Sequence, residues 1–372
     1  MHYRGDDIGQ WYESCSRAFN QHSLVDGAFH VYFLNAPIDI KSLSTWIDYG
    51  ISSWKLGIGY KGPQAAGRTP LNDGDVWEVF AAVGKLPSPA LVMVHAENPD
   101  IMLKGRQLIE SQGRRDMAAW NDSRPRFVEE ECMRMCLFLA EKTDCRLYIV
   151  HITIGEGVDL IADAKRKGIS VIAETCPQYL THNSEEPVAL MRENPALGNV
   201  NPPLRDKWSN ERLWEGLRAG IIDTVGSDHA ASTLAEKGTD IWNAPMGLGN
   251  LTEMILPVML SEGVNKGRLS LNDVVRVCCE NPAKALGLYP KKGVIAVDSD
   301  ADAVIIDLDR DVVVNHANLH SRCDWNIWDG WRFRGWPVTT ILRGHIVYDQ
   351  GRFLAEPGTG RFLPRKRTET QS

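Results

Sequence analysis

Four apolar runs of this chain each end in a side chain of a type that binds metal ions. These residues, each with the run that it ends, are Lys55 (51–55), His95 (90–95), His151 (147–151) and Asp228 (221–228). Short, continuous apolar runs of this kind are typical of buried parallel strands. In a barrel of alternating strands and helices, the carboxyl ends of the strands form the face that carries the chemistry. A lysine, two histidines and an aspartate at such positions predict a metal-dependent hydrolase.

Size, charge and cysteine content narrow the class of protein. The 372 residues are enough for one large hydrophobic core and a smaller companion domain. A net charge of −7 argues against a surface for nucleic acid or an anionic membrane. The eight cysteines include no Cys-x-x-Cys pair, and the first residues lack the apolar core of a signal peptide. We therefore expect a cytoplasmic protein with no disulfides, no membrane segment and no nucleic-acid partner.

Strand-like runs alternate with amphipathic segments over residues 1–290. Two further runs, 28–34 and 169–173, bring the expected number of strands to six. Helix-like stretches such as 127–142 and 156–167 lie between the runs. Strand–helix–strand repetition implies right-handed crossovers and a parallel sheet.

The pattern changes after residue 290. Segment 293–307 predicts two strands around an acidic turn, and 341–354 predicts a hairpin. We therefore expect a small β-rich module over residues 291–356. The remaining residues, 357–372, are polar and basic and are expected to form a solvated tail, with an oligomer contact as the alternative.

Each of the four residues that end a run has an ordinary structural explanation as well as a chemical one. The Lys55 side chain is of a type that often extends to the surface. Buried near metals, its neutral amine can instead react with carbon dioxide to form a carbamate, a carboxylate able to bridge two cations. A histidine such as His95 or His151 is often a hydrogen-bonded core residue, but two at equivalent strand ends favour metal ligands. Asp228 is suited either to cap a helix or to act as a metal ligand and general base.

Several motifs spread over nearly the whole chain resemble those of one enzyme family. The segment 54–62 places Tyr60 five residues after Lys55 in Trp-Lys-Leu-Gly-Ile-Gly-Tyr-Lys-Gly. This stretch resembles the cyclic amidohydrolases, specifically the dihydropyrimidinase and hydantoinase branch. Supporting motifs occur at 94–98, 123–125, 174–180, 202–205, 226–229, 281–284 and 287–290.

The resemblance implies a fold, cofactors and partners. It implies an α/β chain with a (β/α)₈ barrel, a β-sandwich module and a site for two divalent metals, usually zinc. Carbon dioxide would be needed to carboxylate the lysine. The substrate would be a small cyclic amide, opened by metal-bound hydroxide, and the protein would be a homodimer or homotetramer.

The same resemblance assigns roles to individual residues. Lys55 would be the carboxylated bridge, and His95 and His151 would hold one metal. Asp228 would bind the other metal and act as general base. Tyr60 would hydrogen-bond to the oxyanion of the tetrahedral intermediate. Asn201 would belong to the substrate-binding residues, and the backbone around it would contact the ring.

The chain departs from the family pattern at two places. No His-x-His pair occurs, so the second metal would keep only Lys55 and Asp228. The first two barrel strands and the amino-terminal strands of the sandwich would then lie upstream of Met1. Asn201 replaces a serine common among dihydropyrimidinases and is more similar to dihydroorotase or allantoinase. The alternatives are therefore a different ring, a non-catalytic scaffold relative, or an incomplete version of an active enzyme.

Overall fold

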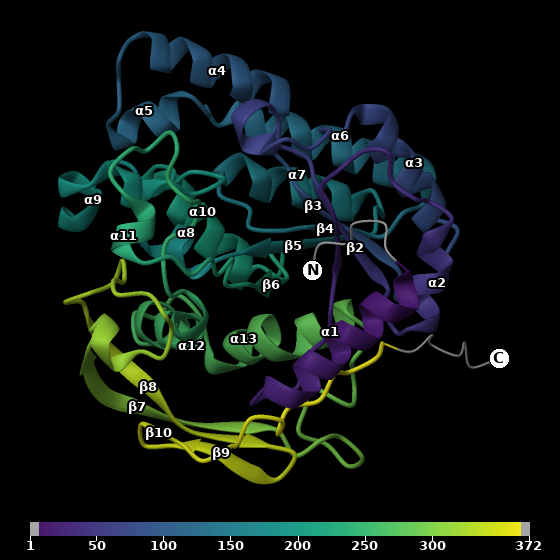
Figure 1. The fold of residues 1–372 in the computed structure, drawn as a ribbon. Helices are drawn as coiled ribbons and strands as arrows, with labels where there is room; N and C mark the ends of the chain where they lie inside the picture. Colours follow the sequence, from purple (N-terminus) through teal and green to yellow (C-terminus); the bar gives the residue numbers. More distant parts are fainter. Residues whose placement is uncertain (1–6, 366–372) are drawn as a thin grey trace.

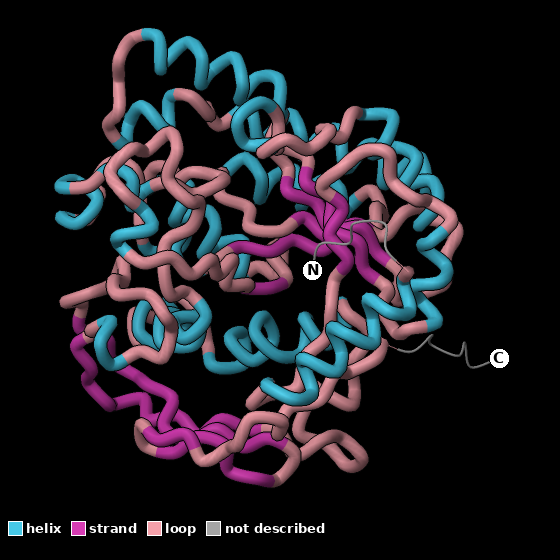
Figure 2. The backbone as a smooth tube through the Cα atoms, viewed as in Figure 1, coloured by secondary structure: helices cyan, strands magenta, loops and turns pink. Residues whose placement is uncertain are grey.

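The structure, a computed structural model, describes residues 7–365 and contains two separate sheets (Figure 1). The first has six strands in the order β1-β2-β3-β4-β5-β6, and the second has four in the order β10-β9-β8-β7. Figure 2 shows helical segments between the two groups of strands. No helix among these residues is both long and apolar enough to cross a membrane.

The six-stranded sheet is parallel throughout, as the sequence predicts. Its strands are β1 (Val31–Phe33), β2 (Ser53–Gly57), β3 (Leu91–His95), β4 (Leu147–Ile149), β5 (Val171–Thr175) and β6 (Thr224–Val225). Strand order follows chain order, so each crossover joins neighbours. Within residues 7–365, β1 and β6 remain the outer strands and the sheet does not close into a barrel.

Helix α1 (Ile8–His22) precedes the first strand, and further helices lie between the strands and cover the sheet. The longer of these are α2 (Ser42–Asp48), α3 (Asp73–Val83), α4 (Pro99–Ser111), α5 (Met117–Asp122), α6 (Phe127–Thr143), α7 (Gly155–Arg166) and α10 (Lys207–Arg218). Helices α3, α6 and α7 each contact the strand that follows them, which is the strand–helix–strand arrangement expected for a parallel sheet. Both helix-like stretches predicted from the sequence, 127–142 and 156–167, are helices within one residue of the expected bounds.

Shorter helices connect the sheet to the carboxyl-terminal region. They are α8 (Pro177–Thr181), α9 (Ala189–Glu193), α11 (Leu234–Lys237), α12 (Ile255–Val258), α13 (Leu271–Val275) and α14 (Asn281–Ala285). Helix α12 packs against the carboxyl-terminal sheet. All eight cysteines are free thiols.

The carboxyl-terminal sheet is antiparallel and differs from the prediction in one segment. Its strands are β7 (Ala303–Val313), β8 (Arg332–Leu342), β9 (His345–Asp349) and β10 (Arg352–Phe353). The hairpin predicted at 341–354 is present. The prediction of a strand over the first part of 293–307 is wrong: Ile295 and Val297 are 87% and 92% exposed, and no neighbouring strand pairs with them in the described chain. The module is one sheet within residues 7–365, where the resemblance implied a sandwich.

Two acidic residues of that segment form ion pairs with Lys292 instead of making a hairpin turn. Lys292 Nζ lies 2.9 Å from Asp300 Oδ2 and 2.6 Å from Asp302 Oδ2. The same amine lies 2.7 Å from Asp26 Oδ2, near the end of the loop after α1. These ion pairs hold residues 300–302 beside the loop that contains Asp26, a position in which these residues have no neighbouring strand to pair with in the described part of the chain.

The expectation of a solvated tail is wrong for residues up to Arg365. Phe362 pairs with Gly27 through an isolated bridge, and its ring lies 4.8 Å from that of Phe29. The Arg365 side chain is buried, donating to Ser53 Oγ at 2.6 Å and to the Phe29 carbonyl. An apolar ring and a buried guanidinium with two acceptors therefore fix this segment against β2 and the loop that contains Phe29. The rest of the predicted tail, 366–372, lies outside the described residues.

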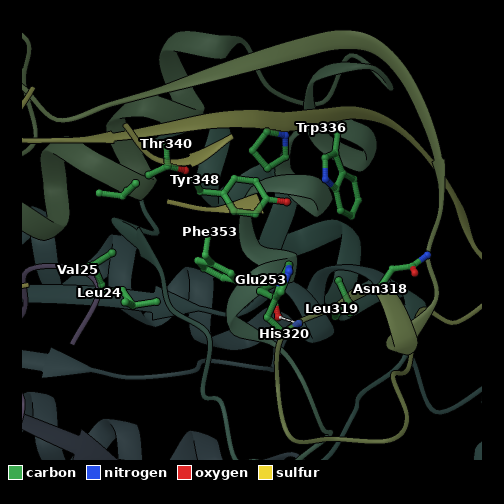
Figure 3. A pocket seen from close by; sticks show the side chains of 12 residues that line it. Leu24, Val25, Glu253, Asn318, Leu319, His320, Trp336, Thr340, Tyr348 and Phe353 are labelled. Atoms are coloured by element: carbon green, nitrogen blue, oxygen red, sulfur yellow. Dashed lines mark hydrogen bonds and ion pairs between the residues drawn. The ribbon is translucent and has the colours of Figure 1, made fainter. Parts of the chain in front are cut away.

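A cavity of about 260 Å³ lies between the carboxyl-terminal sheet and the loop after α1 (Figure 3). Apolar side chains, including Leu24 and Phe353, form much of its lining. His320 Nδ1 lies 2.7 Å from Glu253 Oε2 at its edge. None of the predicted site residues lines this cavity, so it is not part of the site described next.

Candidate active site at the carboxyl ends of the parallel strands

One cavity of about 340 Å³ brings together every residue that the sequence analysis placed in the site. Those residues are Lys55, Tyr60, His95, His151, Asn201 and Asp228. They come from five separate segments of the chain, and the parallel arrangement of the strands brings these segments to the same edge of the sheet. The same cavity is lined by residues that the sequence analysis did not single out, among them Tyr32 and Met246.

The position of each side chain relative to its strand refines the prediction. His95 is the last residue of β3, as expected. Lys55 is the central residue of β2 and not its end, because the strand continues to Gly57. His151 and Asp228 lie just beyond β4 and β6, with φ values of 43° and 50°. Left-handed backbone is uncommon for residues other than glycine, and strain of this kind gathers at functional sites.

The two imidazoles face one another through their nitrogen atoms. His95 Nδ1 lies 3.1 Å from His151 Nε2, and His95 Nε2 lies 2.9 Å from Glu97 Oε2. The Glu97 carboxylate accepts the Nε2 proton of His95, which leaves Nδ1 as the free acceptor nitrogen on the side of His151. Burial lowers the pKa of both histidines, so both are neutral at pH 7, the form that binds metal.

Glu97 is a buried carboxylate that the sequence analysis quoted within a motif but gave no role. Burial by itself would raise its pKa, yet the hydrogen bond from His95 and the positive charges of Arg124 and Arg205 take the pKa below its usual value. Glu97 is therefore ionised behind His95. A carboxylate in this position orients a ligand histidine and increases its basicity.

Lys55 is half-buried and Asp228 is exposed at the cavity, but protein atoms crowd both charged groups, and each shifts the pKa of the other. Burial lowers the pKa of Lys55 to about 8, while Asp228 and Glu174 act in the opposite direction. Burial raises the pKa of Asp228 to about 7, and the lysine partly opposes this. At pH 7 roughly a tenth of such a lysine is neutral, far more than of an exposed one. This neutral amine is the form that reacts with carbon dioxide.

Glu174 at the end of β5 explains a glycine in the 226–229 motif. Its carboxylate accepts hydrogen bonds from Tyr148 Oη at 2.7 Å and from the His151 backbone nitrogen at 3.4 Å. A Cβ at Gly226 would lie 2.5 Å from Glu174 Cδ. A side chain at 226 would therefore displace the Glu174 carboxylate from its contact with the His151 nitrogen.

Tyr60 is paired with a second tyrosine from β1. Its ring lies 5.6 Å from that of His95, and its hydroxyl shares a hydrogen bond with Tyr32. Burial raises the pKa of Tyr60, and the hydrogen bond to Tyr32 opposes this rise. Tyr60 is therefore a protonated phenol, able to donate a hydrogen bond into the cavity. Tyr32 pairs in register with Lys55, which places its ring at the same cavity. The run 28–34 contains a second polar ring, His30, so the run alone does not single out Tyr32.

Asn201 presents an unused acceptor to the cavity. Its Nδ2 atom donates to Met246 Sδ at 2.8 Å. Its Oδ1 atom is buried and has no hydrogen-bond partner among the described residues. An orphaned buried oxygen in a ligand-sized cavity is suited to accept an N–H from a bound ring.

The chemistry of the donor set fits a divalent cation held by the two histidines. Two tetrahedral nitrogen ligands of zinc lie roughly 3.3 Å apart, close to the His95–His151 separation. Within residues 7–365, no three His, Cys, Asp or Glu side chains converge as a ligand group. A cation at His95 and His151 therefore requires a further ligand, which Lys55 supplies only as a carbamate.

Known proteins resemble this chain along most of its length. The model of the amidohydrolase family matches residues 107–347. An L-hydantoinase of Paenarthrobacter aurescens is 39% identical over 319 residues, covering 84% of this chain and 68% of the relative. The solved L-hydantoinase (dihydropyrimidinase) from Arthrobacter aurescens has a TM-score of 0.87 at 35% identity, covering 96% of this chain and 77% of that one. A D-hydantoinase structure from Bacillus sp. AR9 has a TM-score of 0.90 at 31% identity, with 98% and 80% covered. The chain belongs to the amidohydrolase family, in the branch that contains the hydantoinases and dihydropyrimidinases.

Proposed function

We propose that this chain hydrolyses a cyclic amide, opening a hydantoin or dihydropyrimidine ring to an N-carbamoyl amino acid. The observation that carries the proposal is the convergence of Lys55, His95, His151 and Asp228 in one ligand-sized cavity. Membership of the family supports the same class of reaction.

The ligands of a divalent cation such as zinc would be His95, His151 and a carboxylated Lys55. When bound, such a cation supplies hydroxide at neutral pH and polarises the ring carbonyl. Glu97 keeps the His95 Nδ1 atom free to act as a ligand. In the family two metals occupy the site; here Lys55 and Asp228 are the ligands that remain for the second. Assembly as a homodimer or homotetramer and a cytoplasmic location stay predictions from the resemblance and the composition.

The remaining residues act on the ring and on its protons. Asp228, whose pKa burial raises to about 7, takes the proton of the attacking water and delivers it to the leaving ring nitrogen. Tyr60 donates a hydrogen bond to the oxygen that becomes negative. Asn201 Oδ1 accepts from a ring N–H, which holds the carbonyl carbon in place for attack.

A second candidate is a protein that binds a cyclic amide without hydrolysing it. The observation in favour is that the chain has no His-x-His pair, so the second metal has few protein ligands. Retention of Lys55, His95, His151, Asp228 and Tyr60 in one cavity argues for turnover.

A panel of rings tests the two candidates. Protein reconstituted with zinc in bicarbonate buffer is assayed with hydantoin, dihydrouracil, allantoin and dihydroorotate, and binding of each ring is measured by calorimetry. We expect ring opening of hydantoin or dihydrouracil, lost in Asp228→Asn. Binding of a ring with no opening by the metal-loaded protein would replace the proposal with the binding candidate.

A further inference from the structure

A lysine outside the proposed machinery is buried beside the cavity wall. Lys237 is the last residue of α11 and is 1% exposed. Its Nζ atom donates to the carbonyl oxygens of Pro245 at 2.5 Å and Asn199 at 3.2 Å. The ammonium also lies 5.9 Å from the ring of Trp325. Desolvation of a lysine is unfavourable, and burial lowers the pKa of Lys237 to about 7. A residue of this kind needs a reason for its position that an apolar side chain would not supply.

The two carbonyl groups belong to segments that reach the cavity. Asn199 directly precedes Val200 and Asn201, and Pro245 directly precedes Met246. Val200, Asn201 and Met246 line the cavity, and Asn201 Nδ2 donates to Met246 Sδ. Lys237 therefore joins the two segments at the residues behind the wall, and the asparagine–methionine contact joins them at its inner face.

Neighbouring hydrogen bonds also hold the two segments in place, and their donors are a backbone nitrogen and the side chain of Asn199. The Gly247 nitrogen donates to the Asn199 carbonyl at 3.0 Å. Asn199 Nδ2 donates to the Ile241 carbonyl at 2.6 Å. The Pro245 carbonyl, by contrast, is held by the lysine. The Gly247–Asn199 contact also joins the two segments directly, and Lys237 adds a donor to one carbonyl group of each segment.

We infer that Lys237 is a positioning residue, which fixes the separation of segments 199–201 and 245–247 and thereby the size of ring that binds between Asn201 and Met246. The inference rests on the proposed function for the identity of the ligand, a cyclic amide. The clamp, meaning the pair of hydrogen bonds by which Lys237 joins the two segments, does not depend on that function.

The test compares Lys237→Met with a matched surface variant, Lys284→Met. Methionine keeps the length and the apolar body of lysine but has no donor. Lys284 is half exposed on α14 and pairs with Glu280. Hydrogen exchange of zinc-loaded full-length protein is followed by mass spectrometry. We expect peptides covering 199–201 and 245–249 to exchange at least tenfold faster in Lys237→Met and to be unchanged in Lys284→Met.

Kinetics with the ring that wild type opens provide the second readout. We expect Lys237→Met to raise KM about tenfold while kcat stays within threefold, and the preference between hydantoin and dihydrouracil to shrink. Lys237→Gln, which retains an amide donor, should recover part of both effects. It also serves as the test variant if Lys237→Met fails to fold.

Two results would overturn the inference. One is unchanged exchange in these peptides together with unchanged KM. The other is faster exchange spread over the whole chain in both Lys237 variants, which would assign Lys237 to general stability. If wild type opens no ring, the proposed function fails, but the exchange comparison still decides whether Lys237 clamps the wall.

Discussion

The Nδ1 atom of His95 lies 3.1 Å from the Nε2 atom of His151, although 56 positions separate the residues in the chain. Parallel strands β3 and β4 are neighbours, so their carboxyl ends bring the two imidazoles together. Both imidazoles are neutral and buried, and Glu97 binds the far nitrogen of His95. The pair is therefore arranged as two ligands of one cation, with a carboxylate orienting the first.

Replacing the carboxylate behind His95 tests this arrangement. Glu97→Gln keeps the shape of the side chain but removes the negative charge that increases the basicity of His95. We expect metal affinity to fall by roughly 10–100-fold. Equilibrium dialysis against buffered zinc measures the change, with Glu130→Gln on the outer part of α6 as control. Equal affinity of wild type and Glu97→Gln would show that the carboxylate does not support a metal ligand.

The paired tyrosines are expected to differ in their effect on turnover. Tyr60→Phe removes the donor proposed for the oxyanion, and kcat should fall by roughly 10²–10³ with little change in KM. Tyr32→Phe leaves that donor in place but removes the hydrogen bond that orients it, so we expect a loss of about tenfold. Steady-state rates with the ring that wild type opens give both values. A rise in KM at constant kcat for Tyr60→Phe would assign that phenol to substrate binding alone.

A buried histidine away from the site is expected to make stability depend on pH. His182 Nε2 donates to the Ile327 carbonyl at 3.1 Å, and its ring stacks on Trp331. Burial lowers the pKa of His182 from 6.5 to about 4. Because the unfolded chain then binds more protons between these values, the free energy of unfolding falls as pH falls through this window. Over this window, the titration of His182 is expected to lower the free energy of unfolding by about 3 kcal/mol.

Urea unfolding of metal-free protein at pH 7 and pH 4 measures this contribution. His182→Phe should be less stable at pH 7, because hydrogen bonds are lost, but should lose less stability on acidification than wild type. The same pH dependence in both proteins would mean that His182 is not held neutral.

The carboxyl-terminal segment is expected to stabilise the fold through Arg365. Arg365→Met removes the donors to Ser53 Oγ and to the Phe29 carbonyl. We expect a loss of about 2 kcal/mol in the free energy of unfolding. Urea denaturation checks this, with Arg361→Met, whose residue is exposed in the same segment, as control. A loss below 0.5 kcal/mol would show that the segment contributes little.

The parallel sheet could be predicted from the sequence because its strands are buried on both faces. Such strands are continuous apolar runs, and six runs became β1 to β6. The strand bounds differ from the prediction in places: the run predicted to end at Lys55 corresponds to β2, which begins at Ser53 and continues to Gly57. Strand ends depend on pairing with neighbours, which a single run does not record.

What the sequence did not reveal depends on contacts between distant segments. Segment 293–302 has alternating apolar residues but no strand to pair with. Phe362 and Arg365 look like parts of a solvated tail until the loop containing Phe29 is beside them. Glu97 and Lys237 received no role because their partners, the His95 ring and two backbone carbonyls, are set by the fold alone.

The most direct test of the account is ring opening by zinc-loaded protein, prepared with bicarbonate, in wild type and in Lys55→Ala. Without the lysine there is no carbamate to complete the ligands at His95 and His151. We predict stoichiometric zinc and measurable opening of hydantoin or dihydrouracil in wild type. Lys55→Ala should lose at least 10³-fold in kcat/KM, in line with loss of an essential group. Equal rates in the two proteins, or a wild type that holds zinc but opens neither ring, would contradict the account.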